Sequence, residues 1–336
     1  MKKYFYSMAC LLGGLFAFLV LPAQSGFHLM HTYHIASPGG WDYIAAGPGN
    51  GRIYVSHGTQ VNILNAATGD SVGVIPNTTG VHGIAFDPAM NTGYTSNGRL
   101  NSVTVFDLRD NHVITTIPTG ENPDAIMYDP FTKRIITCNG RSQDLSVIDP
   151  ATAKVVATIP VGGKPETAVS DEKGRLFVNL EDKSSIAVVN LAAGKVETTW
   201  SLSPSEGPTG LAIDRKTMRL FAGCDKTLVV IDATQGTVTD RVTIGDGCDG
   251  VGFDEQTHLV FASCGEGVLS VVREDAHGKC TLVENAPSKR GARTLAVDPA
   301  THQVYLPTAD FEQTTQPGER RPRMIPGTFQ VLVMGR

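Results

Sequence analysis

One recurring phrase constrains the fold of this chain more than any other feature of its sequence. The phrase consists of four short apolar runs, Pro123–Pro130, Arg134–Gly140, Leu145–Asp149 and Val155–Pro160. Turn residues close each run, and the phrase begins again at Pro165. Four short strands that repeat about every 40 residues, with no helical period between them, are typical of the blades of a β-propeller.

Alignment of the phrase predicts the number of blades. Seven copies, separated by 40 to 44 residues, begin near Trp41, Val81, Pro123, Pro165, Pro208, Cys248 and Ala292. Six residues after each start stands an aspartate, except in the first copy, which has Gly47. An aspartate there predicts a tight turn, because its carboxylate can accept a hydrogen bond from the backbone two residues later. We therefore predict an all-β domain over residues 26–336, a seven-bladed β-propeller of four-stranded blades.

The last copy of the phrase has only three of the four predicted strands. Its apolar runs lie at 293–298, 304–307 and 329–333, and no fourth run follows them. A further apolar run, residues 29–36, precedes the first copy. We predict that this N-terminal strand completes the last blade, because closure of the ring removes the unpaired edge that an open array would leave.

The first 25 residues resemble a secretory signal peptide in their charge and hydropathy. Lys2 and Lys3 precede an apolar run over residues 8–21, and small residues lead up to Ser25. This run is shorter than the roughly 20 apolar residues of a membrane-spanning helix. We predict cleavage near Ser25, a mature start near Gly26 and a periplasmic or secreted protein with no transmembrane span in the mature chain.

The charge balance disfavours nucleic acid as a partner. Removal of residues 1–25 deletes two lysines and no acid, which leaves 26 basic against 33 acidic residues and a net charge of −7. A nucleic-acid-binding domain usually carries a basic face. DNA binding is therefore the least favoured function.

The ends of the predicted second strands carry a family resemblance. They read Tyr54-Val55-Ser56-His57, Tyr94-Thr95-Ser96-Asn97, Ile136-Thr137-Cys138-Asn139 and Tyr305-Leu306-Pro307-Thr308. Together with Pro123-Asp124-Ala125-Ile126 and the Asp-Pro turns, these endings resemble the YVTN-repeat (YncE-like) β-propeller family over essentially all of the mature chain. The resemblance implies an exported binding or surface protein. Similar rings also host lactonases and lyases, so the fold alone does not decide the function.

Two rings of residues are expected at one end of the central channel. The first ring is the second residue of each innermost strand: Asp42, His82, Asp124, Glu166, Thr209, Asp249 and Arg293. The second ring closes each second strand and includes the residues just beyond it: His57, Asn97, Arg99, Asn139, Arg141, Glu181, Asp182, Cys224, Cys264, Glu266 and Asp310. Ionisable residues at the ends of apolar strands predict a ligand site at the channel mouth. The alternative is a solvated polar mouth without a specific ligand.

A divalent metal ion is the one cofactor that these residues suggest. His57, His82, Asp124 and Glu166 come from successive blades, and imidazole with carboxylate suits Zn²⁺ or Mn²⁺. The alternative is that the histidines are hydrogen-bonded residues of the rim. Because no nucleophile–base pair is recognisable, we hypothesise a binding module that holds a small anionic ligand or a partner's loop. The alternative hypothesis is a metal-assisted enzyme of the lactonase or lyase type.

Five cysteines remain after removal of the leader: Cys138, Cys224, Cys248, Cys264 and Cys280. An oxidising compartment favours at least one disulfide, and Cys248 and Cys264 fall opposite each other across a predicted hairpin. Three alternatives stay open. Cys224 could replace one partner, Cys224 with Cys248 and Cys264 could bind a metal, or the thiols could be buried and free.

The last blade carries an insert between its second and third strands. It runs from Ala309 to Gly327, contains Arg320-Arg321-Pro322-Arg323 and lies close to Lys289 and Arg290. Long loops in compact domains are usually functional or disordered. The basic cluster favours a cationic flap that attracts an anionic ligand over the mouth, and the alternative is a solvated loop.

Overall fold

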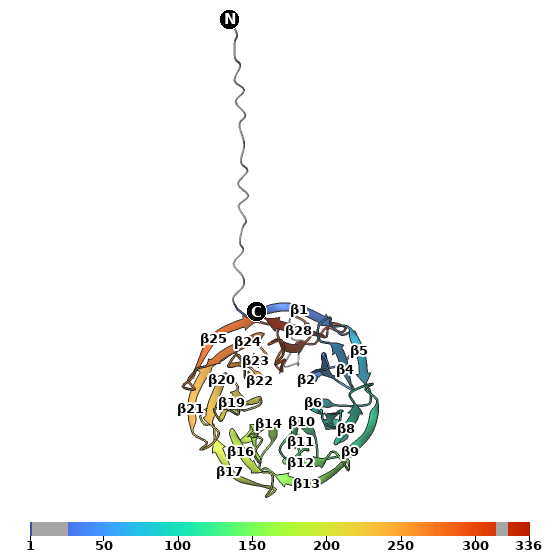
Figure 1. The fold of residues 1–336 in the computed structure, drawn as a ribbon, viewed down its shortest axis with the longest axis vertical. Helices are drawn as coiled ribbons and strands as arrows, with labels where there is room; N and C mark the ends of the chain where they lie inside the picture. Colours follow the sequence, from blue (N-terminus) through green and yellow to red (C-terminus); the bar gives the residue numbers. More distant parts are fainter. Residues whose placement is uncertain (2–25, 314–321) are drawn as a thin grey trace.

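Seven antiparallel four-stranded sheets surround a central axis, and the chain passes from one to the next around the ring (Figure 1). The structure is a computed structural model that describes residue 1, residues 26–313 and residues 322–336. Six sheets use consecutive strands, and the seventh joins the first strand of the chain to the last three. The predicted seven-bladed, all-β propeller is confirmed. The predicted signal peptide lies, apart from Met1, outside the described residues.

Each blade contributes one strand to each of four ranks, counted outward from the axis (Figure 1). The innermost strands are β2 (Trp41–Ala46), β6 (Val81–Asp87), β10 (Pro123–Asp129), β14 (Pro165–Ser170), β18 (Leu211–Asp214), β22 (Cys248–Asp254) and β26 (Ala296–Val297). The second strands are β3 (Arg52–His57), β7 (Thr92–Asn97), β11 (Arg134–Asn139), β15 (Arg175–Leu180), β19 (Arg219–Cys224), β23 (Leu259–Cys264) and β27 (Val304–Thr308).

The two outer ranks complete the blades. The third strands are β4 (Gln60–Asn65), β8 (Ser102–Asp107), β12 (Asp144–Asp149), β16 (Ser185–Asn190), β20 (Thr227–Asp232), β24 (Val268–Glu274) and β28 (Gln330–Gly335). The outermost strands are β5 (Ser71–Ile75), β9 (Val113–Pro118), β13 (Lys154–Pro160), β17 (Lys195–Ser201), β21 (Val238–Thr243), β25 (Cys280–Pro287) and β1 (His28–His34). Two 3₁₀ turns, η1 (Gly98–Leu100) and η2 (Glu181–Lys183), lie between second and third strands.

The aspartates at the ends of the innermost strands make the turns that the repeat predicted. Asp87 Oδ1 accepts a hydrogen bond from the amide of Ala89 at 3.0 Å, and Asp214 Oδ1 accepts one from Lys216 at 2.8 Å. The same bond to the amide two residues later is made by Asp171, Asp254 and Asp298. These carboxylates satisfy backbone donors where each strand ends, which explains the recurrence of the residue.

The apolar core lies between neighbouring blades. Six of the seven second strands place an aromatic ring at the same position, and all six are less than 2 % exposed: Tyr54, Tyr94, Phe177, Phe221, Phe261 and Tyr305. Burial of such a side chain stabilises the fold by about 2 kcal/mol or more. The hydroxyl of Tyr94 is hydrogen-bonded to Thr92 at 2.9 Å, so the buried polar end is satisfied.

The ring is closed by the two ends of the chain. β1 pairs antiparallel with β28, with Tyr33 opposite Val331 and His34 opposite Gln330. Figure 1 shows β1 in blue on the outer side of β28 in red. The predicted closure is therefore confirmed. Within the residues that the structure describes, no helix has the length and apolar character needed to cross a membrane.

Candidate functional site

The innermost strands are bulged where the first predicted ring of residues lies. In β10, Pro123 pairs with Asn139 and Ile126 pairs with Thr137, so Asp124 and one neighbour face a single residue of β11. The same extra residue occurs in β2, β6, β14 and β22. A bulge re-aims a side chain relative to the regular alternation of the strand. The bulged segments contain five members of the first ring: Asp42, His82, Asp124, Glu166 and Asp249.

Serines of the second strands hold these bulges in place. Ser96 Oγ accepts a hydrogen bond from the Gly83 amide at 2.8 Å and donates one to the Asp124 carbonyl of the next blade. Ser263 Oγ donates in the same way to the carbonyl of Arg293. These serines were not predicted from the sequence. Their signal is a serine next to last in the second strand, which recurs at Ser56, Ser96 and Ser263.

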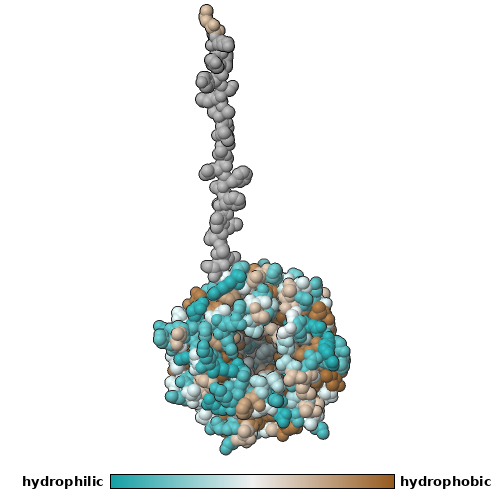
Figure 2. All heavy atoms as spheres, viewed as in Figure 1, coloured by the Kyte–Doolittle hydropathy of each residue, from teal (hydrophilic) through white to brown (hydrophobic). Residues whose placement is uncertain are grey.

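Below the ring, the innermost strands enclose a channel. Its cavity of about 200 Å³ is lined by residues of all seven blades, including Tyr43, Thr167 and Asp249. Figure 2 shows a hollow at the centre of the molecule. The innermost strands begin at one end of this channel. We call that end the channel mouth. Burial and the charge of Asp124 hold the pKa of Tyr43 well above its usual value, so the phenol stays protonated.

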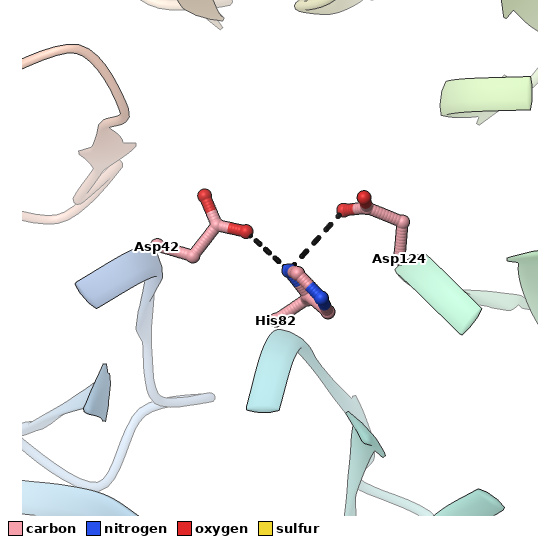
Figure 3. Close-up of side chains that lie close together, drawn as sticks. All are labelled: Asp42, His82 and Asp124. Atoms are coloured by element: carbon pink, nitrogen blue, oxygen red, sulfur yellow. Dashed lines mark hydrogen bonds and ion pairs between the residues drawn. The ribbon is translucent and has the colours of Figure 1, made fainter. Parts of the chain in front are cut away.

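Three of the ring residues meet at the channel mouth (Figure 3). His82 Nδ1 lies 2.6 Å from Asp42 Oδ2 and 3.8 Å from Asp124 Oδ1. One ligand atom from each side chain lies within 4.8 Å of the others. Burial lowers the pKa of His82, but the hydrogen bond to Asp42 and the charge of Asp124 outweigh burial and raise the pKa. We call these three residues the Asp–His–Asp cluster.

The acids of the first ring are partly or fully buried beside one another, which favours their neutral forms. Burial raises the pKa of Asp124 to about 6, although the charge of His82 opposes the shift. Burial and the charge of Asp124 raise the pKa of Glu166 to about 8. The pKa of Asp249 is also raised by burial, against the opposing charge of Arg293. Ionisation of all four carboxylates together is therefore unfavourable.

Two cations partly balance these acids. Arg293 Nε lies 2.6 Å from Asp249 Oδ2, and its Nη2 lies 3.4 Å from Asp42 Oδ1. Lys164 Nζ lies 2.6 Å from Glu166 Oε1 and also contacts Glu181. Lys164 was not predicted from the sequence, because no other repeat has a lysine at the equivalent loop position. Only two permanent cations face the four ring carboxyl groups, so a bound cation would favour the ionised forms of these groups.

The structure corrects the predicted second ring at three residues. His57, Asn97 and Asn139 are fully buried and do not line the channel mouth. His57 Nδ1 is hydrogen-bonded to Ser37 Oγ at 2.7 Å, and its Nε2 lies 3.0 Å from the Gly39 carbonyl. Both ring nitrogens are engaged, so Asp42 replaces His57 in the candidate cluster, and Glu166 lies beside the cluster, paired with Lys164.

The other residues of the second ring are divided between core and rim. Cys224 and Cys264 are buried, whereas Arg99, Arg141, Asp182 and Glu266 are exposed. Asp310 pairs with Lys289, whose Nζ lies 2.5 Å from Asp310 Oδ1. Thr209, the neutral member of the first ring, donates from Oγ1 to the Cys248 carbonyl at 2.8 Å.

The predicted disulfide is not formed. Cys248 and Cys264 stand opposite each other across β22 and β23, as expected, but all five described cysteines are buried free thiols. Cys248 Sγ donates to the Gly250 carbonyl at 3.7 Å, and Cys264 Sγ donates to the Ala262 carbonyl at 3.5 Å. Among the described residues, Cys224, Cys248 and Cys264 do not form a group of metal ligands.

The ends of the insert in the last blade form a short two-stranded arm. Phe311 pairs with Met324, and the Ile325 amide donates to the Asp310 carbonyl at 2.8 Å. Arg320 and Arg321, on which the predicted cationic flap depends, lie outside the described residues. The described arm places Phe311 6.0 Å from Trp41 between ring centroids, next to the channel mouth.

Comparison with known proteins supports the fold and goes no further. No family model and no curated protein matches this chain. Among solved structures, the hydrazine synthase of Kuenenia stuttgartiensis is similar, with a TM-score of 0.73 and 17 % sequence identity. The match covers 81 % of this chain and 94 % of that chain. At this identity the likeness shows a shared propeller fold only.

Proposed function

We propose that the channel mouth is a divalent-cation site and that the protein is a binding module that holds a small anionic ligand, or a partner's loop, through this cation. The observation that carries the proposal is the Asp–His–Asp cluster, in which three strands from different blades bring ligand atoms within 4.8 Å of one another. Carboxylate and imidazole together suit Zn²⁺ or Mn²⁺.

The electrostatics of the mouth support a cation before an anion. The raised pKa values of Asp124 and Glu166 report that their charged forms are disfavoured. A bound divalent cation would offset this repulsion and favour the ionised carboxylates. Its free coordination positions could then accept an anionic group, which explains how an acidic mouth would hold an anion. Arg293, at the edge of the cluster, is placed to orient that group.

Calorimetric titration of chelator-treated protein with Mn²⁺ or Zn²⁺ tests this proposal. We expect one cation per chain, and Asp124→Asn should weaken its binding at least about tenfold, because the cluster loses a charged ligand. Asp110→Asn is the matched control, since Asp107, Asp110 and His112 also bring ligand atoms together but are mostly exposed. Absence of binding to the wild type, or equal losses in both variants, would contradict the cation site.

One observation favours the enzyme of lactonase or lyase type as a second candidate. The pKa values of Asp124, about 6, and Glu166, about 8, lie in the range useful for general acid–base catalysis. Metal-dependent turnover of lactones that is lost in Glu166→Gln, while Mn²⁺ binding is retained, would favour the enzyme over the binding module.

We also propose that the chain is exported and belongs to the YVTN-repeat (YncE-like) family. The basic and apolar residues of segment 1–25 support export, and the strand endings of β3, β7, β11 and β27 support the family. Mass spectrometry of protein recovered from the periplasm or medium should give a mature chain that starts near Gly26. Recovery of the full-length chain from the cytoplasm alone would refute export.

A further inference from the structure

A second pocket lies beside the channel mouth, where the last two blades meet the first. Its volume is about 550 Å³, within the range of small-molecule sites. Residues from the loops of these blades line it: Gly40, Trp41, Asp246, Gly247, Gly265, Glu266, Arg290, Gly291, Arg293, Phe311 and Pro322. None of these residues belongs to the Asp–His–Asp cluster.

The pocket combines aromatic side chains with walls of bare backbone. The rings of Trp41 and Phe311 lie 6.0 Å apart between centroids and are tilted by 57°. Four of the lining residues are glycines, which present no side chain: Gly40, Gly247, Gly265 and Gly291. Two aromatic faces in an otherwise open pocket suit a planar apolar group, because aromatic pairs contribute attraction beyond their buried area.

The pocket also offers one available charge of each sign. The guanidinium of Arg290 is exposed and forms no hydrogen bond or ion pair with the part of the chain that the structure describes. Glu266 accepts a hydrogen bond from the Asp246 amide at 3.0 Å, and no cation pairs with its carboxylate among the described residues. The other two charged residues are engaged, Arg293 with Asp249 and Asp246 with Lys226 at 3.2 Å.

We infer that this pocket binds an aromatic α-amino acid in its zwitterionic form. The ligand's carboxylate would pair with Arg290, its ammonium with Glu266, and its ring would pack on Trp41 and Phe311. A ligand with only one charge would leave either Arg290 or Glu266 without a charged partner in the complex. The inference does not rest on the proposed cation site, because none of the three cation-ligand residues lines the pocket and Arg293, which borders both sites, is given no role in binding the amino acid.

Three probes that differ by one charged group test the inference: L-phenylalanine, 3-phenylpropanoate and 2-phenylethylamine. In calorimetric titrations we expect L-phenylalanine to bind about tenfold more tightly than either of the others, as expected for one charge-assisted hydrogen bond. Arg290→Gln should weaken the binding of L-phenylalanine about tenfold and leave the binding of 2-phenylethylamine unchanged. Glu266→Gln should weaken the binding of L-phenylalanine by the same factor and leave the binding of 3-phenylpropanoate unchanged.

Matched controls separate the pocket from the general charge of this face. Arg141→Gln and Glu121→Gln remove exposed charges from the loops of another blade and should leave all three probes unaffected. Gly265→Leu should block the pocket without disturbing the fold. The nearest atoms to a Cβ at this position, Gly247 O and Arg293 Cβ, lie at 3.4 and 3.7 Å, and the backbone is not left-handed.

The outcomes keep this inference distinct from the proposed function. Equal binding of the three probes, no binding to the wild type, or equal losses in the control variants would overturn the amino-acid pocket. Gly265→Leu should bind Mn²⁺ as the wild type does, and Asp124→Asn should bind L-phenylalanine as the wild type does. Failure of Mn²⁺ binding alone would therefore remove the cation site and leave the amino-acid pocket standing.

Discussion

Deletion of residues 27–36 is expected to open the ring and to make the mature protein aggregate. β1 supplies the outermost strand of the last blade, so its loss would expose the edge of β28. It would also remove three buried side chains: Phe27, which packs between the sixth and last blades, and Tyr33 and Ile35, which pack between the last and first blades. Loss of the burial of three such side chains should lower the free energy of unfolding by about 6 kcal/mol. Size-exclusion chromatography and thermal melting of the deletion variant would measure the effect.

Single substitutions within β1 provide matched controls. Tyr33→Ala should lower the free energy of unfolding by about 3 kcal/mol, because it empties a buried site. Leu29→Ser, on an exposed part of the same strand, should leave the melting temperature within about 1 °C of the wild type. A deletion variant that stays monomeric and melts like the wild type would refute the closure by β1.

The cation-free protein should become less stable as the pH rises from about 4.5 to about 8. Glu166 has an ordinary pKa of 4.5, and burial and Asp124 raise it to about 8 in the folded protein. Between these values the folded state keeps a proton that the unfolded state releases, so the free energy of unfolding falls with increasing pH. Asp124 acts in the same direction from 3.8 to about 6.

His82 adds to the same trend. Its pKa is raised from 6.5 in the folded state, so its contribution is fully present below 6.5 and is lost as the pH rises through the folded value. All three groups therefore make the folded state of the cation-free protein less stable in neutral than in acidic solution. Mn²⁺ should raise the melting temperature more at pH 8 than at pH 5, because protons compete with the cation for Asp124.

Glu166→Gln isolates the main source of this pH dependence. The variant should match the wild type near pH 4 and melt roughly 5 °C higher at pH 8, since it never has to ionise a buried carboxyl. Lys164 keeps Glu181 as a partner in the variant. Glu121→Gln, which removes an exposed carboxyl, should not change the slope. If the melting temperatures of Glu166→Gln and the wild type changed with pH in the same way, the assigned pKa of Glu166 would be contradicted.

The fold and the first ring could be predicted because both depend on repetition. The aspartate turns and the seven innermost strands recur at fixed offsets, so a residue type that reappears at one offset marks one place in space. The prediction of the second ring was wrong at His57, Asn97 and Asn139, because each is the last paired residue of its strand. His57 still pairs with Trp41 and Gln60. A displacement of one residue along a strand moves a side chain to the opposite face of the sheet. The repeat did not show on which face the last residue of each second strand lies.

Features that occur once were not predictable in the same way. Lys164 lies at the mouth only because a loop carries it there, and Phe311 meets Trp41 only because the insert folds back as an arm. The alignment of Cys248 with Cys264 followed from the hairpin register, but their oxidation state does not depend on register. Contacts between single residues of distant blades leave no period in the sequence.

The bulge in the innermost strands has a consequence for how such a molecule can change. A bulged residue has no direct partner across the ladder, so its replacement disturbs little of the sheet. Thr209, which precedes β18 at the same offset of the repeat, is a neutral member of the ring. Mutation at these positions could therefore give a new recognition specificity while the buried aromatics and the closure of the ring, which hold the fold together, stay unchanged.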